Sequence, residues 1–296
     1  MFKLLILGML TLIIILVLFK AYDSQILNIV SRSPGSCATK DIVFSKEFNL
    51  KADIYYPPAS KQCQQNTLAQ TIPTVVFIHG GSWRNGNKET YKFVADFFTN
   101  HGYNVIIPSY RLYPEAAYPE FISDLERFFV WLSTQSQAHN IQTDDIFLIG
   151  HSAGAYNAAM YLFSPNYKKP MTINGFVGLA GPYDFFLPAT QDKEYYPIFT
   201  QRDPAFNSKG SQPAQQLPNK DIANVLTKAL ILHGSNDTTV TPKNPEHIHP
   251  LLLASGVKSH YKIYPDKDHV QLVTGLANIP FLGFKMREDI LTFMAE

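Results

Sequence analysis

The chain has 296 residues, of which 46% are hydrophobic and 17% are charged, and its formal net charge is +1. This length and composition allow a substantial buried core, which excludes a disordered chain and favours one domain of about 250 residues. A net charge near zero provides no basic field for nucleic acid and no acidic face for cationic partners. We therefore expect no nucleic-acid partner.

The first twenty residues differ in kind from the rest. Between Lys3 and Lys20 lie sixteen uncharged residues, LLILGMLTLIIILVLF, which as a helix would extend about 24 Å against a hydrocarbon core of about 30 Å. We expect residues 1–20 to form an uncleaved membrane anchor. A cleaved signal peptide is the alternative, but it needs small residues at the cleavage site, and bulky Phe19 stands two positions before Ala21.

On either interpretation of the amino terminus, we expect the remainder of the chain to be exported. We expect the domain to be anchored to the membrane and to face the periplasm or the extracellular side, or else to be secreted. Residues 21–40 are polar and mixed in composition, and they predict a linker between the membrane and the domain.

From residue 41 onwards the sequence alternates strand and helix signals. Residues 41–57 predict two strands joined by a short turn. Continuous apolar runs predict buried strands over 74–81, 104–110, 145–150, 173–181, 228–235 and 260–265. Helical spacing marks 91–103 and 121–135, and an alanine-rich helix follows residue 152. This order predicts an α/β domain over 41–296, with a mostly parallel sheet, helices on both faces and an N-terminal antiparallel hairpin.

The stretch Gly150-His151-Ser152-Ala153-Gly154 matches G-x-S-x-G at the junction of a strand and a helix. Flanking glycines allow the backbone to turn sharply there without side-chain collisions, and the serine hydroxyl then projects from the edge of the sheet. We expect Ser152 to be a catalytic nucleophile.

A serine hydroxyl is a weak nucleophile at neutral pH, so it needs a base and a carboxylate to orient that base. On this strand-turn-helix pattern the acid and then the histidine follow the serine along the chain. Asp237 comes just after the strand at 228–235, and His269 follows the last strand. Asp266 and Asp268 are alternatives for the acid, although a side chain next to the base on an extended loop points away from it.

The other histidines receive no catalytic role. His79 and His233 end buried strands before glycine, and we expect them to brace their loops. His247 and His249 are two positions apart, a spacing that does not converge on one metal ion in a helix. We expect no metal and no organic cofactor.

The tetrahedral intermediate of acyl transfer needs hydrogen-bond donors for its oxyanion. Residues 79–83, HGGSW, follow a predicted strand and offer backbone N–H groups that no bulky side chain shields. We expect the N–H groups of Gly81 and Ser82 to act here, with Gly80 as the lesser candidate. The N–H of Ala153, at the start of the helix after the nucleophile, is the other expected donor.

The chain contains two cysteines. Cys37 precedes the first predicted strand and Cys63 follows the second, so antiparallel pairing would bring both to the same end of the hairpin. In an exported protein such a pair predicts a disulfide. Two unrelated free thiols are the alternative.

In this order, the segments HGGSW, SYRLYPEAAYP, GHSAGA, GPYD, HGSNDTTV and DHV resemble the alpha/beta hydrolase superfamily. The resemblance covers residues 41–296 and is to the carboxylesterase branch, which includes hormone-sensitive-lipase-like and feruloyl-esterase-like enzymes. One departure is Ser82 followed by Trp83, where many hormone-sensitive-lipase-like members have a third glycine. HGG-x-W instead resembles kynurenine formamidases and isoprenylcysteine methylesterases. A second departure is Ser235, where relatives often carry an acid, which leaves Asp237 as the match to the carboxylate.

The resemblance implies a cap insertion at about residues 182–226. Its aromatic residues either line an acyl or alcohol pocket or pack the insertion onto the core; they include Phe185, Phe186, Tyr195, Tyr196 and Phe199. We expect a serine hydrolase that cleaves short-chain carboxylic esters, small-molecule substrates, through an acyl-enzyme. The alternatives are an arylformamidase-type amidase and a catalytically silent binding module on the same fold.

Overall fold

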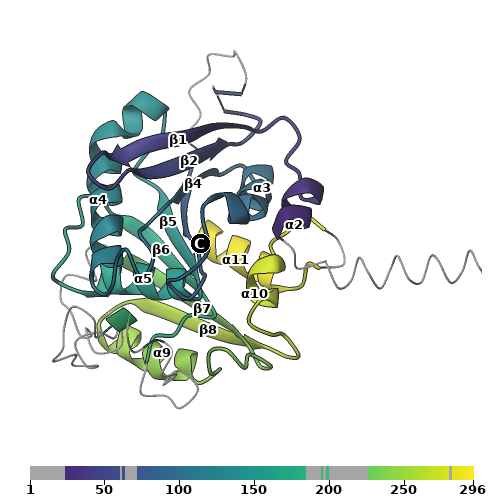
Figure 1. The fold of residues 1–296 in the computed structure, drawn as a ribbon. Helices are drawn as coiled ribbons and strands as arrows, with labels where there is room; N and C mark the ends of the chain where they lie inside the picture. The colour runs from purple at the N-terminus through teal and green to yellow at the C-terminus, as the bar shows by residue number, and fades with distance from the viewer. Residues whose placement is uncertain are drawn as a thin grey trace, which may run out of the picture.

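The computed structural model describes residues 24–60, 62–63, 72–184, 195, 198–199, 226–279 and 282–296. Within these ranges, eight strands form one sheet in the order β1-β2-β4-β3-β5-β6-β7-β8 (Figure 1). The strands are β1 Cys37–Ser45, β2 Leu50–Tyr56, β3 Thr74–Ile78, β4 Asn104–Pro108, β5 Ile146–His151, β6 Ile173–Leu179, β7 Leu226–Gly234 and β8 Lys258–Tyr264.

Strand β2 pairs antiparallel with β1 and with β4, and the pairings from β4 through β3, β5, β6 and β7 to β8 are parallel. The predicted N-terminal hairpin and mostly parallel sheet are therefore confirmed. The helical segments are α2 Ser24–Val30, η1 Glu89–Tyr91, α3 Lys92–Asn100, α4 Glu120–Gln135, η2 Ser136–His139, α5 Ala153–Phe163, α9 Asn244–Ala254, α10 Gln271–Thr274 and α11 Met286–Ala295.

Successive strand residues face opposite sides of the sheet and enter two hydrophobic cores. In β3, Val76 and Ile78 belong to the core under α4, α5 and α9. Val75 and Phe77 belong to the core under α3, α10 and α11. Figure 1 shows these two helical layers on opposite sides of the sheet. Burial on both faces explains why the strands form continuous apolar runs, and it confirms helices on both faces.

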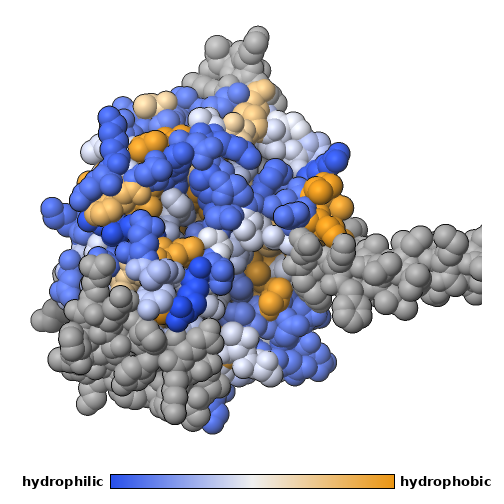
Figure 2. Space-filling view, in the orientation of Figure 1, coloured by the Kyte–Doolittle hydropathy of each residue, from blue (hydrophilic) through white to orange (hydrophobic). Residues whose placement is uncertain are grey.

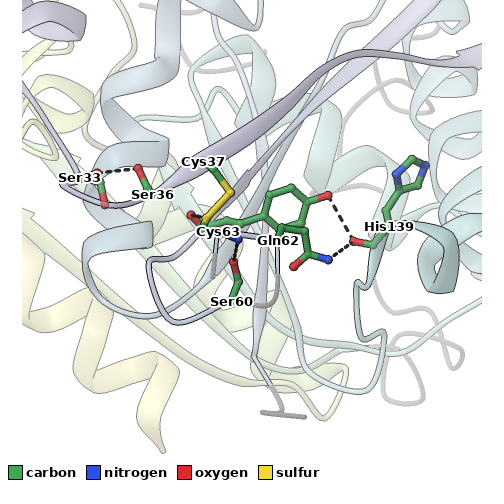
Figure 3. Close-up of a disulfide and its surroundings, with 8 residues drawn as sticks. Ser33, Ser36, Cys37, Ser60, Gln62, Cys63 and His139 are labelled. Atoms are coloured by element: carbon green, nitrogen blue, oxygen red, sulfur yellow. Dashed lines mark hydrogen bonds between the residues drawn. A yellow bond between two sulfur atoms is a disulfide. The ribbon is translucent and has the colours of Figure 1, made fainter. Parts of the chain in front are cut away.

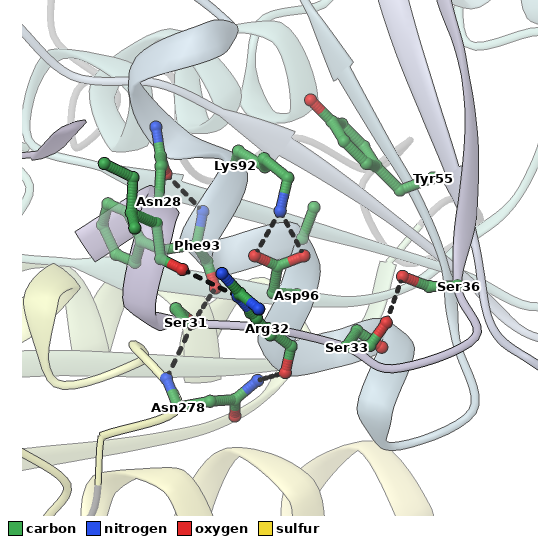
Figure 4. Close-up of polar contacts among 12 residues, drawn as sticks. Asn28, Ser31, Arg32, Ser33, Ser36, Tyr55, Lys92, Phe93, Asp96 and Asn278 are labelled. Carbon is green, nitrogen blue, oxygen red and sulfur yellow. Dashed lines mark hydrogen bonds and ion pairs between the residues drawn. The ribbon is translucent and has the colours of Figure 1, made fainter. Parts of the chain in front are cut away.

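The structure corrects the predicted linker, because residues 24–40 are part of the folded domain. Helix α2 buries Leu27 completely. The Asn28 side chain accepts a hydrogen bond from the Phe93 N–H (2.8 Å), and the Ser31 hydroxyl accepts one from the Asn278 N–H (2.9 Å) (Figure 4). Strand β1 then begins at Cys37 rather than at residue 41. One apolar side chain and a few side chain-to-backbone bonds hold residues 24–36, so this part of the sequence lacked a periodic apolar signal.

The outer side of α2 carries two exposed apolar side chains, Ile29 and Val30. On the face shown in Figure 2, hydrophobic residues form small separate groups among hydrophilic ones, and one of these groups lies at the position of α2. The predicted anchor or signal segment, residues 1–20, lies outside the described residues. Within the ranges that the structure describes, no helix is both long and apolar enough to span a bilayer.

Cys37 and Cys63 form a disulfide, with their Cα atoms 5.5 Å apart (Figure 3). The sheet register explains their proximity: Cys37, the first residue of β1, pairs with Tyr56, the last residue of β2. The chain turns just after β2, where the N–H of Cys63 donates to the Ser60 carbonyl oxygen (3.2 Å). The bridge therefore closes the open end of the hairpin.

Replacing both cysteines (Cys37→Ser with Cys63→Ser) is expected to lower the free energy of unfolding by about 3–4 kcal/mol under non-reducing conditions. The physical reason is that the bridge, with a sequence separation of 26, restricts the unfolded chain. Urea titration of both proteins measures this, and wild type in excess reductant should match the double variant. Equal unfolding midpoints with and without the bridge would contradict the expectation.

Candidate active site

Ser152 occupies a sharp turn between β5 and α5. Its backbone has φ 54° and ψ −122°, a conformation that side chains rarely adopt. A Cβ atom on Gly150 would lie 2.6 Å from the Gly154 carbonyl oxygen, and one on Gly154 would lie 2.1 Å from the Ile78 carbonyl oxygen. Only glycine fits at these two positions, which is the steric reason for the G-x-S-x-G pattern.

The structure brings Ser152, His269 and Asp237 into contact, although they are far apart in sequence. The Ser152 Oγ lies 2.8 Å from His269 Nε2. The His269 Nδ1 lies 2.7 Å from the Asp237 Oδ2. The serine follows β5, the carboxylate follows β7 and the histidine follows β8, so the parallel order of the sheet places all three at the carboxyl ends of its strands. With Nδ1–H donating to the carboxylate, Nε2 is free to accept the serine proton.

The Asp237 carboxylate is buried and has four donor groups around it. Its Oδ1 accepts from the N–H groups of Thr239 (2.9 Å) and Val240 (2.8 Å). Its Oδ2 accepts from His269 Nδ1 (2.7 Å) and lies 3.0 Å from His233 Nε2. Burial acts to raise the pKa of Asp237, but the hydrogen bonds from His233 and His269 outweigh it and hold the pKa well below its ordinary value. The carboxylate is therefore ionised at neutral pH.

The two alternative acids serve the loop rather than the histidine. The Asp268 Oδ1 accepts from the Gln271 N–H (2.8 Å) just before α10. Asp266 lies in a turn with φ 58°, and its N–H donates to the Ser235 hydroxyl (2.9 Å). Within the described part of the chain, neither carboxylate contacts His269.

The loop after β3 lies against the serine turn. A Cβ atom on Gly80 would lie 3.2 Å from the Ser152 Cβ. Gly81 has φ 128°, and its carbonyl oxygen accepts from the N–H groups of Arg84 and Asn85. A Cβ on Gly81 would lie 2.0 Å from the Asn85 carbonyl oxygen, so this tight turn requires glycine.

The predicted oxyanion donors are backbone N–H groups in the loop after β3 and at the start of α5. In the described ranges, the backbone N–H groups of Gly81, Ser82 and Ala153 donate no hydrogen bond within the protein. Burial raises the pKa of Tyr91 to about 12, and a hydrogen bond with the Gly80 backbone opposes it. Gly80 stays the lesser predicted donor.

The contacts of Trp83 explain why a tryptophan follows the glycine loop. Its indole N–H donates to Asn157 Oδ1 in α5 (2.9 Å), and the ring is almost completely buried. The Phe199 ring packs edge-on against it at 5.1 Å. Trp83 therefore ties the glycine loop to the helix that follows the nucleophile.

Most of the predicted cap, residues 182–226, lies outside the described residues, including Phe185, Phe186 and Tyr196. Phe199 is only 2% exposed and also packs against Phe121 at 6.1 Å, so this member of the cap packs onto the core. The Tyr195 hydroxyl lies 3.5 Å from the Ser82 hydroxyl. Tyr195 thus reaches the loop beside the serine.

Two further histidines are buried near Ser152. The His151 Nε2–H donates to the His269 carbonyl oxygen (3.1 Å), and burial lowers the pKa of His151 to about 3. Burial likewise lowers the pKa of His79 to about 4, and its Nδ1–H donates to the Gly80 carbonyl oxygen. Both rings are neutral donors that hold loops. His247 contacts Asp184 (3.1 Å), and the described residues contain no group of three or more metal-ligating side chains.

The BD-FAE family model matches residues 52–252. The kynurenine formamidase of Danio rerio is 25% identical over 248 residues, covering 83% of this chain and 79% of the relative. A probable isoprenylcysteine alpha-carbonyl methylesterase of Arabidopsis thaliana is 24% identical over 254 residues, covering 80% of this chain and 58% of the relative.

Among solved structures, esterase B of Lactobacillus rhamnosis superposes with a TM-score of 0.76 at 16% identity, covering 97% of this chain and 94% of that one. A second structure of the same esterase, inhibited by a C4-C4 tributyrin phosphonate, gives a TM-score of 0.75 at 18% identity with the same coverage. At this identity the likeness shows the fold.

Proposed function

The chain belongs to the BD-FAE family and is a hydrolase with the alpha/beta hydrolase fold, and on this basis we propose that it cleaves short-chain carboxylic esters through an acyl-enzyme. The observation that carries the proposal is the continuous hydrogen-bonded row from Ser152 Oγ through His269 to Asp237, at 2.8 and 2.7 Å. This row supplies a nucleophile, a base and an orienting carboxylate in contact.

In the proposed reaction, Ser152 Oγ attacks the ester carbonyl carbon while His269 Nε2 takes the hydroxyl proton. The ionised Asp237 stabilises the imidazolium that forms. The N–H groups of Gly81, Ser82 and Ala153 donate to the carbonyl oxygen as negative charge develops on it. Ala153 also begins helix α5, whose N-terminus favours negative charge. His269 then protonates the leaving alcohol, and water attacks the acyl-enzyme with the same residue as base.

A formamidase activity is the second candidate, and a specific observation favours it. The similarity to the kynurenine formamidase of Danio rerio covers 83% of the present chain. The HGG-x-W pattern also occurs here, and its tryptophan is buried. The same row of residues would cleave an aryl formamide, and the acyl-enzyme would then carry a formyl group on Ser152 Oγ. The catalytically silent module has no support, because the compared relatives are hydrolases and Ser152, His269 and Asp237 are in contact.

Short acyl groups are expected to give the highest kcat/KM. Residues 200–222 are mostly polar and rich in proline, which does not favour a broad apolar lid, and each buried methylene contributes only about 0.8 kcal/mol. p-Nitrophenyl esters from acetyl to palmitoyl, with an aryl formamide alongside, measure this directly. A maximum at acetyl to butyryl supports the proposal. A maximum at dodecanoyl or longer would overturn the short-chain assignment, and a higher kcat/KM for the formamide would favour the amidase.

We also propose that the domain is exported. The proposal is supported by the apolar run between Lys3 and Lys20 and by the Cys37–Cys63 disulfide, which is typical of oxidising compartments. An alkaline phosphatase reporter fused after Glu296 is expected to be active outside the cytoplasmic membrane, and deletion of residues 1–20 should silence it. A protein in the cytosol with both thiols free would contradict this expectation.

A further inference from the structure

His233, near the end of β7, has one ring N–H between two oxygen atoms, and one of these belongs to the carboxylate that orients His269. Its Nε2 lies 3.0 Å from the Asp237 Oδ2 and 3.0 Å from the Val240 carbonyl oxygen. The side chain is completely buried. Its Nδ1 is buried without a hydrogen-bond partner in the described part of the chain. These contacts define the neutral tautomer with the proton on Nε2, because a charged ring would bury an unpaired Nδ1–H.

The two histidines share one carboxylate oxygen. Asp237 Oδ2 accepts from His269 and lies 3.0 Å from His233 Nε2, while Oδ1 accepts from two backbone N–H groups. We infer that His233 is a positioning residue, whose Nε2–H holds Asp237 Oδ2 in line with His269 Nδ1. The same N–H partly compensates the negative charge of the Asp237 carboxylate next to His269. The inference rests on the proposed function of Ser152, His269 and Asp237.

The direction of the effect on pH follows from the groups that face His269. These are Asp237 after β7, Ser152 after β5 and the neutral His151, whose ring centroid is 5.0 Å from that of His269. Without the His233 bond, Asp237 would carry more uncompensated charge and would stabilise protonated His269 more strongly. Because His269 must be neutral to act as a base, the acid limb of the kcat/KM profile should move to higher pH.

Three substitutions separate positioning from packing. A glutamine in place of His233 can present an N–H donor near the Nε2 position, whereas an asparagine carries the same amide on a shorter side chain that does not reach Asp237. We expect His233→Gln to retain kcat within about threefold, and His233→Asn and His233→Leu to lose about tenfold or more, with KM within about twofold in all three. The exposed His260 provides the matched control, as His260→Gln should leave kcat unchanged.

The measurements are kcat, KM and the pH profile of kcat/KM, together with the low-field proton NMR signal of the His269 Nδ1–H. We expect the acid limb to move upward and the NMR signal to shift in His233→Asn and His233→Leu but not in His233→Gln. If His233→Leu does not fold, the comparison of glutamine with asparagine decides the question. Equal kcat and superimposable pH profiles for glutamine and asparagine would overturn the inference. Loss of all activity in Ser152→Ala shows separately that the proposed function stands.

Discussion

Ser152→Ala is expected to lower kcat by several orders of magnitude, on the order of 10⁵-fold to 10⁶-fold, as for other serine hydrolases that lose the nucleophile. The Ser152 Oγ is 2.8 Å from the only base that contacts it among the described residues. Among the described residues, no other hydroxyl contacts His269 Nε2, so no neighbouring side chain can replace the nucleophile. The variant should also lose labelling by a fluorophosphonate.

The fold should survive this change, because the substitution keeps Cβ and removes one hydroxyl from a turn whose conformation the two glycines already permit. Near-UV circular dichroism and thermal unfolding check this. Ser235→Ala is the matched control, since Ser235 follows β7 and bonds to the Asp266 N–H rather than to His269. Undiminished ester hydrolysis or labelling in Ser152→Ala would remove the proposed mechanism as a whole.

Asp237→Asn is expected to lower kcat by about 10⁴-fold, the size of effect known for a triad whose histidine takes the wrong tautomer. The hydrogen-bond pattern explains why the amide cannot substitute. The four groups around the Asp237 oxygens are all donors: the side chains of His233 and His269 and the backbone N–H groups of Thr239 and Val240. In either flip, the asparagine NH₂ faces two donors and leaves them unpaired.

Asp266→Asn and Asp268→Asn make the same chemical change on the loop of His269 and are expected to alter kcat by less than about threefold. Steady-state rates on p-nitrophenyl acetate for the three variants, each below its own unfolding temperature, test the assignment. Full activity in Asp237→Asn, with a large loss in Asp266→Asn or Asp268→Asn, would show that the wrong acid has been chosen.

Several features were predictable from the sequence because their causes act over a few residues. Continuous apolar runs predicted the strands from β3 to β7 because both faces of the sheet are buried there. Gly150 and Gly154 predicted the turn at Ser152 because a Cβ atom at either position would collide with a nearby backbone oxygen. The order of serine, acid and histidine along the chain follows from the strands that precede them.

Other features depended on contacts between distant segments. The choice of Asp237 over Asp266 and Asp268 depends on how β7 and β8 pair, since Asp237 and His269 are 32 positions apart. The bond from the Trp83 indole to Asn157 joins segments that carry no shared pattern.

The sequence by itself determined the α/β class, the sharp turn at Ser152 and a short set of candidate acids and bases, because strand burial and glycine sterics leave local patterns. Only the tertiary structure decided that α2 docks on the domain, that Trp83 donates to Asn157 and that His233 lies against Asp237. The physical reason is that a hydrogen bond depends on the positions of two atoms in space. Residues such as Asn28 and Phe93, which are 65 positions apart, meet only once the chain has folded.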